Sequence, residues 1–150
     1  MFPLVEHIPK LILASLIGWT IGAERALQKK RKHVGVGTCS LISMICCLLT
    51  IISKYCLGDV ADPSRLIANI ITAIGFLCGG VIFVKPNDEH DDEEVVGLTT
   101  GAIMFGLSAL GIMIGLGYWQ FAIASAILVL ANLTMSKLFK KYFKHLENIE

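Results

Sequence analysis

The sequence predicts an all-α integral membrane protein: a compact bundle of five transmembrane helices with glycine-rich helix seams, its N-terminus outside the cell and its C-terminus in the cytoplasm. First, 55% of the 150 residues are hydrophobic and only 17% are charged, which is more apolar than an ordinary soluble domain. Second, glycines recur four residues apart within long uncharged stretches. This spacing lets helix backbones approach closely in lipid, whereas a glycine inside a helix in water costs roughly 0.5–1 kcal/mol relative to alanine. A chain of this length predicts one domain, 1–150, that ends in a short basic cytoplasmic tail over 137–150.

The five helices are expected near 5–23, 34–54, 66–84, 96–116 and 119–137. The first has the weakest pattern, because its uncharged run is shorter than the roughly 20 residues that cross a bilayer. It must therefore include the turn that carries Glu6 and Lys10. The second and third helices each follow from a single uncharged run of about the length of one span.

The fourth and fifth helices follow from one long uncharged stretch, 95–136. It is about twice as long as the roughly 20 residues of one span, so it predicts two helices. The break is expected at 115–120, where glycines loosen the chain and where Tyr118 and Trp119 suit a membrane interface.

Lysine and arginine set the predicted orientation. Of the 13 such residues, only Lys10, Lys54 and Arg65 would lie on one side of the membrane. The others fall on the opposite side, which the positive-inside rule assigns to the cytoplasm. Five spans then place the N-terminus outside.

Pairs of glycines mark the faces on which the helices are expected to pack. These pairs are Gly18 and Gly22, Gly75 and Gly79, Gly97 and Gly101, and Gly111 and Gly115. On the fourth helix the glycines align with Met104 and Ser108 at helical spacing, which predicts one nearly continuous seam of mostly small residues.

Glu24 and Arg25 end the first helix. Charged side chains near a helix end can reach the membrane interface, so interfacial anchoring is one interpretation. The other is a specific polar junction that reaches the turn at 35–38 or the one at Thr99 and Thr100. The candidate residues for this junction and for helix packing are Gly22, Glu24, Arg25, Gly35, Thr38, Gly75, Gly79, Gly97, Thr99, Thr100, Gly111 and Gly115.

The segment before the third helix has a structural and a functional interpretation. In the first, Asp62 caps the helix, Pro63 occupies its first turn, and the two threonine hydroxyls of the fourth helix bond backbone carbonyls. In the second, acidic and polar groups outside and hydroxyls deep in the membrane form a cation path. The candidate residues of the path are Asp59, Asp62, Arg65, Asn69, Thr99 and Thr100.

The run DEHDDEE at 88–94 crowds six carboxylates around one histidine. A hard cation such as Mg²⁺ would relieve their repulsion, which makes Asp88, Glu89, Asp91 and Asp92 candidate metal ligands. The alternative is a solvated loop, or one that pairs loosely with the lysines and arginine of 29–32. No cofactor is required on this interpretation, and Mg²⁺ is the candidate ligand.

Several classes of function lack their usual residues in this sequence. We expect no enzyme, because the chain has no recognisable pair of nucleophile and base, no phosphate-binding loop and no zinc-ligand set. Nucleic-acid binding is not expected, since the basic blocks are short and have no interleaved aromatic residues. The five cysteines form no CxxC pair and are expected to pack as small apolar residues.

Six short motifs together resemble the membrane domain of the MgtC/SapB family. They are GWTIGAER at 18–25, GVGT at 35–38, ADPSR at 61–65, IGFLCGGVI at 74–82, VGLTTGA at 96–102 and LGIMIGLG at 110–117. Each motif alone is weak, but their order and spacing match over about residues 12–135. The chain departs from the family pattern at Gly37, where the family carries an arginine, and at Ala73 and Cys78, where it carries glycines.

The resemblance implies a multi-pass protein of the bacterial inner or plasma membrane that is tied to magnesium limitation and stress. Many relatives also carry a soluble C-terminal domain. Two functions follow as hypotheses. In the preferred one, the protein packs in lipid as a homodimer or against a membrane ATPase or transporter and modulates that partner. In the alternative, it conducts Mg²⁺ or another cation itself.

Overall fold

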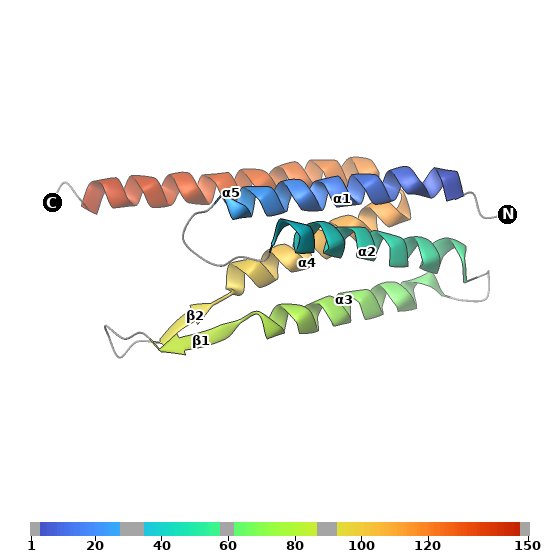
Figure 1. Ribbon diagram of the computed structural model, residues 1–150, viewed down its shortest axis with the longest axis horizontal. Coiled ribbons are helices and arrows are strands. Elements are labelled where there is room, and N and C mark those ends of the chain that lie inside the picture. Colours follow the sequence, from blue (N-terminus) through green and yellow to red (C-terminus); the bar gives the residue numbers. More distant parts are fainter. Residues whose placement is uncertain (1–3, 28–34, 58–61, 87–92, 148–150) are drawn as a thin grey trace.

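The structure, a computed structural model, describes residues 4–27, 35–57, 62–86 and 93–147. Within these ranges it contains five helices and one two-stranded hairpin (Figure 1). The helices are α1 Leu4–Ala26, α2 Val36–Tyr55, α3 Pro63–Gly80, α4 Leu98–Leu116 and α5 Trp119–Glu147, and the strands are β1 Phe83–Pro86 and β2 Glu93–Val96. The prediction of a five-helix protein is confirmed, and the hairpin is an element that the sequence did not lead us to expect.

Successive helices alternate in direction, so α1, α3 and α5 run one way and α2 and α4 the other (Figure 1). α2 packs against both α1 and α4, and α3 packs against α4 and α2. The C-terminal ends of α1 and α5 lie at the same end of the bundle as the hairpin, which we call the hairpin end. The start of α1 and the connection between α4 and α5 lie at the other end, which we call the turn end.

The apolar core lies mainly along α2 and α4, where side chains such as Ile51, Leu107 and Ile114 are almost fully buried. α5 is bound to this core much more loosely. Only 11% of its apolar span is buried, against 56% for α4. Its exposed side chains include Phe121, Ile127 and Leu128. Such a large exposed apolar surface is typical of a protein that faces lipid.

Three helices are long and apolar enough to cross a membrane: α2, α4, and α5 over Trp119–Lys137. α1 is 23 residues long but carries charged side chains near both of its ends. The apolar part of α3, Ser64–Gly80, is shorter than these spans. Five helices are therefore present in the described ranges, of which three have the length and composition of a membrane span.

The third helix is shorter than the sequence predicts. We expect it to continue to 84, but α3 ends at Gly80, and Val81 caps it by donating its N–H to the carbonyl of Cys78 at 3.3 Å. Glycines at the end of the helix favour termination, and the β-branched residues that follow favour a strand. Correcting this boundary shortens the apolar helix by one turn.

The two strands that follow form an antiparallel hairpin in which Phe83 lies opposite Val96 and Lys85 opposite Glu94. Gly97 joins β2 to α4 with a φ of 98°, in the left-handed region. A Cβ atom at this position would lie 1.9 Å from the carbonyl oxygen of Val81. Only glycine fits this turn, because both the backbone conformation and the space exclude a side chain.

The predicted break between the fourth and fifth helices is confirmed. α4 ends at Leu116, and Gly117 adopts a φ of 102°, which is the left-handed conformation that glycine accepts at a helix C-terminus. α5 begins two residues later and continues to Glu147, well beyond the predicted end of the span at 137. Most of the expected basic tail over 137–150 is therefore a helical extension of α5.

Candidate functional site

Two glycines bring α1 and α2 into backbone contact. A Cβ atom at Gly18 would lie 2.6 Å from the carbonyl oxygen of Cys39, and one at Gly22 would lie 3.0 Å from the Cα of Val36. Beside this contact, the hydroxyls of Ser15 and Ser40 lie 2.8 Å apart. Side chains of any size would force these helices apart, so the glycines determine how closely they pack.

Two more glycines bring α4 against the opposite side of α2. A Cβ at Gly111 would lie 2.2 Å from the carbonyl oxygen of Ser43, and one at Gly115 would lie 2.8 Å from that of Cys47. Ser108 of the predicted seam is buried as well and bonds its own helix at the carbonyl of Phe105. α2 is thus held between two glycine-lined neighbours.

The glycines of α3 have different surroundings. A Cβ at Gly75 or Gly79 would meet nothing within 4 Å, so these two residues face outward and make no helix contact within the described chain. The contact of α3 with α4 uses Gly101 instead, whose carbonyl oxygen lies 3.1 Å from the sulfur of Cys78. The glycine spacing predicts that all four pairs pack against neighbouring helices, and α3 departs from this prediction.

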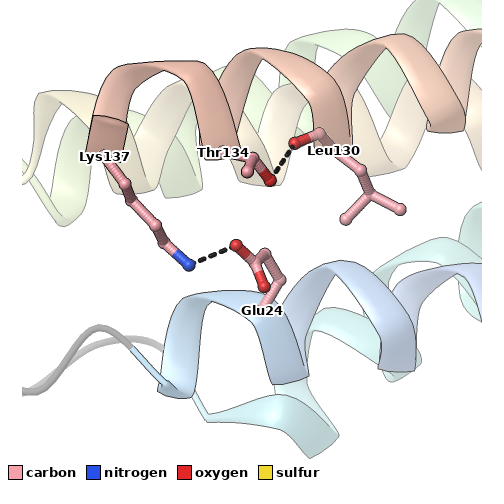
Figure 2. Close-up of polar contacts among 4 residues, drawn as sticks. All are labelled: Glu24, Leu130, Thr134 and Lys137. Atoms are coloured by element: carbon pink, nitrogen blue, oxygen red, sulfur yellow. Dashed lines mark hydrogen bonds and ion pairs between the residues drawn. The ribbon is translucent and has the colours of Figure 1, made fainter. Parts of the chain in front are cut away.

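An ion pair joins α1 to α5 at the hairpin end. The ammonium of Lys137 bonds the carboxylate of Glu24 (Figure 2). The two side chains are 35% and 22% exposed, respectively. Thr134, one turn before the lysine, bonds the carbonyl of Leu130 on its own helix rather than the carboxylate. The pair is thus a specific link between two helices that pack loosely elsewhere.

The partner of Glu24 differs from the one that the sequence suggests. We expect the partner of Glu24 at 35–38 or at Thr99 and Thr100, but the partner is Lys137. From the sequence, this lysine counts only as one of the basic residues that predict the orientation. Arg25 is buried, at 8% exposure. Gly35 caps the start of α2 without a side-chain hydrogen bond, and Thr38 is exposed in its first turn. The lysine was missed because the sequence does not show which helices are neighbours.

A cavity of about 300 Å³ opens between α1, α4 and α5, close to the ion pair. Its walls are mainly apolar and include Ile21, Leu107, Leu110 and Val129. Its polar lining residues are Thr99, Asn132 and Ser136. Asn132 donates its side-chain amide to the carbonyl of Leu128 on its own helix, α5, at 2.9 Å.

The described residues of the predicted cation path lie toward the two ends of the bundle. Arg65 and Asn69 are exposed on α3 at the turn end, whereas Thr99 and Thr100 begin α4 at the hairpin end. Of the path residues that the structure describes, only Thr99 lines the cavity. Asp59 lies outside the described residues.

Asp62 is the N-cap of α3, as the structural interpretation predicts. Its carboxylate accepts a hydrogen bond from the backbone N–H of Ser64 at 2.9 Å. Hydrogen bonds from the side chain and then the backbone of Ser64 lower the pKa of this carboxyl below its ordinary value. An exposed carboxylate in this position stabilises the first turn of the helix in its charged form.

A basic cluster at the turn end was not found in the sequence. The ring of Tyr55 receives the ammonium groups of Lys10 and Lys54 at 5.3 Å and 5.2 Å from its centroid. The ring of His7 lies 4.7 Å away. Lys54 also donates to the carbonyl of Leu116 at the end of α4, at 2.9 Å. The spacing of His7 and Lys10, one turn apart on α1, is the signal that could have indicated this cluster.

The four candidate metal ligands, Asp88, Glu89, Asp91 and Asp92, lie outside the described residues. Within the part of the chain that the structure describes, no group of three His, Cys, Asp or Glu side chains could hold a metal ion.

The sequence pattern of the MgtC family matches residues 11–142. The chain belongs to this family. Protein SapB of Bacillus subtilis is 40% identical over 131 residues, which are 82% of this chain and 53% of the relative. The Escherichia coli K12 protein YhiD, named as a proposed magnesium transporter, is 36% identical over 83% of this chain and 58% of its own length. Protein MgtC of Salmonella typhimurium LT2 is 33% identical over 90% of this chain and 53% of the relative.

The chain therefore spans little more than half the length of these MgtC-family relatives. No solved structure matches it. Gly37, the position at which the resemblance leads us to expect an arginine, lies in the exposed first turn of α2, and a Cβ atom there would meet nothing within 4 Å.

Proposed function

We propose that this MgtC-family protein acts in magnesium homeostasis and stress adaptation in the bacterial cell membrane, by packing with another membrane protein and modulating its activity. The partner is an ATPase or a transporter, and the same packing surface can hold a second copy of this chain. The magnesium link rests on the family and on the name of the Escherichia coli relative. The mode of action rests on the outward face of α3.

The outward face of α3 carries this proposal. Gly75 and Gly79 have open space where a side chain would be, and Ala68 and Thr72, about two turns and one turn earlier, are exposed as well. In lipid, a helix face of small residues gains dispersion contacts when another helix packs against it. The buried glycines of α4 show what such a face does when a partner is present, since Gly111 admits the backbone of α2.

The experiment is to fill this face and to measure both assembly and function. Gly75→Leu and Gly79→Leu should weaken cross-linking of the protein in native membranes and impair complementation of growth at low Mg²⁺. Ala131→Leu is the control, because Ala131 is a small exposed residue on another helix, α5, and is not among the residues that line the cavity. Full complementation and unchanged cross-linking by the α3 variants would overturn the proposal.

The polar junction gives a second test of the same proposal. We expect Glu24 and Arg25 to stabilise the active packing, since both lie at the end of α1 beside the Gly22 contact. If Glu24→Ala and Arg25→Ala both keep wild-type oligomerisation and full growth at low Mg²⁺, the junction has no such role.

The second candidate function is transport of Mg²⁺ or another cation by the protein itself, favoured by the name of the relative YhiD. It predicts cation flux into liposomes that contain only the purified protein, with loss of flux in Asp62→Ala or Thr100→Val. Vesicles with protein that show no more flux than empty vesicles would exclude it. Modulation of a partner is preferred because, in the described helices, carboxylates such as Glu6, Glu24 and Asp62 lie near helix ends, whereas many coupled transporters carry them deep in the membrane.

A further inference from the structure

The cavity between α1, α4 and α5 is the feature that the proposed function leaves unexplained. Ile21 of α1 contributes to its lining, Leu107 and Leu110 come from α4, and Val129 and Leu133 come from α5. α5 leaves most of its apolar span exposed, so the cavity lies under the helix that is bound most loosely to the bundle. In a membrane, the surroundings of α5 are lipid.

The size of the cavity limits what can occupy it. A helix with its side chains is about 10–12 Å across, so a helix from another protein cannot enter a space of about 300 Å³. This volume is at the lower end of the roughly 300–1,000 Å³ typical of pockets for small molecules. A single flexible hydrocarbon chain fits both the volume and the apolar walls.

The polar residues indicate how such a chain would be oriented. Thr99 begins α4, and Ser136 lies near the hairpin end of α5, so both are at the end of the cavity nearest the ion pair. From Thr99 to Leu110 the lining of α4 extends about 16 Å at 1.5 Å per residue. This length is about half of the roughly 30 Å hydrocarbon core, which is one leaflet. An amphiphile would therefore lie with its polar part at the hairpin end and its chain toward the bilayer centre.

The charges at this end select the type of amphiphile. Lys137 follows Ser136 directly and keeps 35% of its side chain exposed while it pairs with Glu24. An ammonium has three donors, so it can hold the carboxylate and a second anionic oxygen together. Beyond it, α5 continues with Lys140, Lys141 and Lys144 in its sequence. A run of lysines at the end of a membrane helix is typical of a surface that attracts anionic lipid.

We propose that this cavity holds one acyl chain of an anionic phospholipid, with Thr99 and Ser136 donating to its ester oxygens and Lys137 facing its phosphate. The lipid fills the space between α5 and the rest of the bundle and so takes the place of missing protein contacts there. The site is independent of whether the protein modulates a partner or conducts a cation.

The test uses the full chain purified in detergent and mixed with phosphatidylglycerol or phosphatidylcholine, with bound lipid counted by native mass spectrometry. Gly106→Leu fills the cavity, because Gly106 lines it and has no atom within 4 Å of its Cβ position. Gly75→Leu makes the same change on α3, outside the cavity. We expect the wild type and Gly75→Leu to retain one phosphatidylglycerol, and Gly106→Leu to bind it about tenfold more weakly. Lys137→Gln should lose the preference for phosphatidylglycerol over phosphatidylcholine while still binding lipid.

A second measurement needs no substitution in the cavity. Phosphatidylglycerol with a photoactivatable group in its acyl chain should cross-link the wild type in membranes on α4 and α5, at peptides that include Ile103 or Leu133, both of which line the cavity. The proposal is overturned if the adducts are spread equally over the exposed face of α3, or if Gly106→Leu binds phosphatidylglycerol as tightly as Gly75→Leu does. It is also overturned if a chain-to-chain cross-link replaces the lipid adducts, because the occupant is then protein.

Discussion

Gly111 and Gly75 both lie inside helices, and each has a second glycine four residues further along. Their surroundings differ, because one position is crowded and the other is open. At Gly111 the carbonyl of Ser43 occupies the place of a side chain, whereas at Gly75 that place is open. The helix backbone gains from an alanine at either position. The effect of the substitution is therefore decided by the neighbour and not by the helix.

We predict that Gly111→Ala destabilises the protein by about 1–3 kcal/mol, because the added methyl group would lie 2.2 Å from a backbone oxygen and must push α4 and α2 apart. Gly75→Ala should be neutral or stabilising by up to about 1 kcal/mol. Unfolding of the purified proteins in mixed detergent micelles, followed by circular dichroism, measures both. Equal losses of stability in the two variants would contradict the tight contact at Gly111.

Asp62 permits a prediction of pH dependence. Its pKa is lowered in the folded protein by hydrogen bonds from Ser64, so the cap stabilises α3 above the ordinary carboxyl pKa of 3.8. The stabilisation is lost as the pH falls through the lower, folded pKa. We expect Asp62→Ala to be less stable than the wild type at neutral pH, and the difference to shrink in acid below that range. Asp62→Asn, which can cap the helix without a charge, serves as the control. Its stability relative to Asp62→Ala should not depend on pH in this range. If the difference in stability between these two variants also shrank in acid, the carboxylate would not be the cause.

Single residues show the limit of what this sequence predicts. The cap at Asp62 follows from local order alone, since the acceptor and its donor are two positions apart. The glycine spacing shows that close packing is possible but not which helix is the partner, and so Gly75 and Gly111 look alike. The partner of Glu24 could not be found for the same reason, because Lys137 is far away in the sequence and adjacent only in the fold.

At the scale of elements, the Glu24–Lys137 pair is a specific polar contact between α1 and α5. Both side chains are partly exposed, so we expect a coupling energy of about 0.5–1 kcal/mol, toward the upper end for exposed pairs. A double-mutant cycle with Glu24→Gln and Lys137→Gln measures it. Lys85→Gln, a change of an exposed lysine on β1 at the same end of the bundle, is the control and should show no coupling to Glu24. A coupling to Lys137 as small as that to Lys85 would mean that the pair does not hold α5.

The elements themselves were predicted unequally well. The break before α5 was found because Gly117 and the aromatic residues after it are local signals. The sequence does not reveal the hairpin, because the length of an uncharged run alone predicts a helix. The run that contains α3 continues without a charge through Ile82 and Val84, so it also includes the start of β1. The valines on both sides of the acidic run were the available signal for strands.

At the scale of the whole molecule, the alternating helices separate the chain into two ends. The hairpin end gathers the end of α1, both strands and the end of α5, and the turn end gathers the start of α1 and the end of α2. This grouping agrees with the positive-inside prediction for the described residues: their lysines and arginines at the turn end are Lys10, Lys54 and Arg65, and those at the hairpin end are Arg25, Lys85, Lys137, Lys140, Lys141 and Lys144. The orientation in the membrane remains a prediction, with the hairpin end in the cytoplasm.

The native cysteines provide a direct measurement of this orientation. Cys56, just beyond α2 at the turn end, is exposed, whereas Cys39, Cys46 and Cys47 are buried. A membrane-impermeant maleimide added to intact cells should therefore label Cys56, and the three buried thiols should react only after denaturation. In a Cys56→Ser background, Lys85→Cys at the hairpin end should be labelled only once the membrane is permeabilised. If the new cysteine is labelled in intact cells and Cys56 is not, the orientation is the reverse of the predicted one. The lipid cavity would then lie in the outer leaflet. There, the anionic surface potential of the cytoplasmic leaflet no longer favours the proposed lipid.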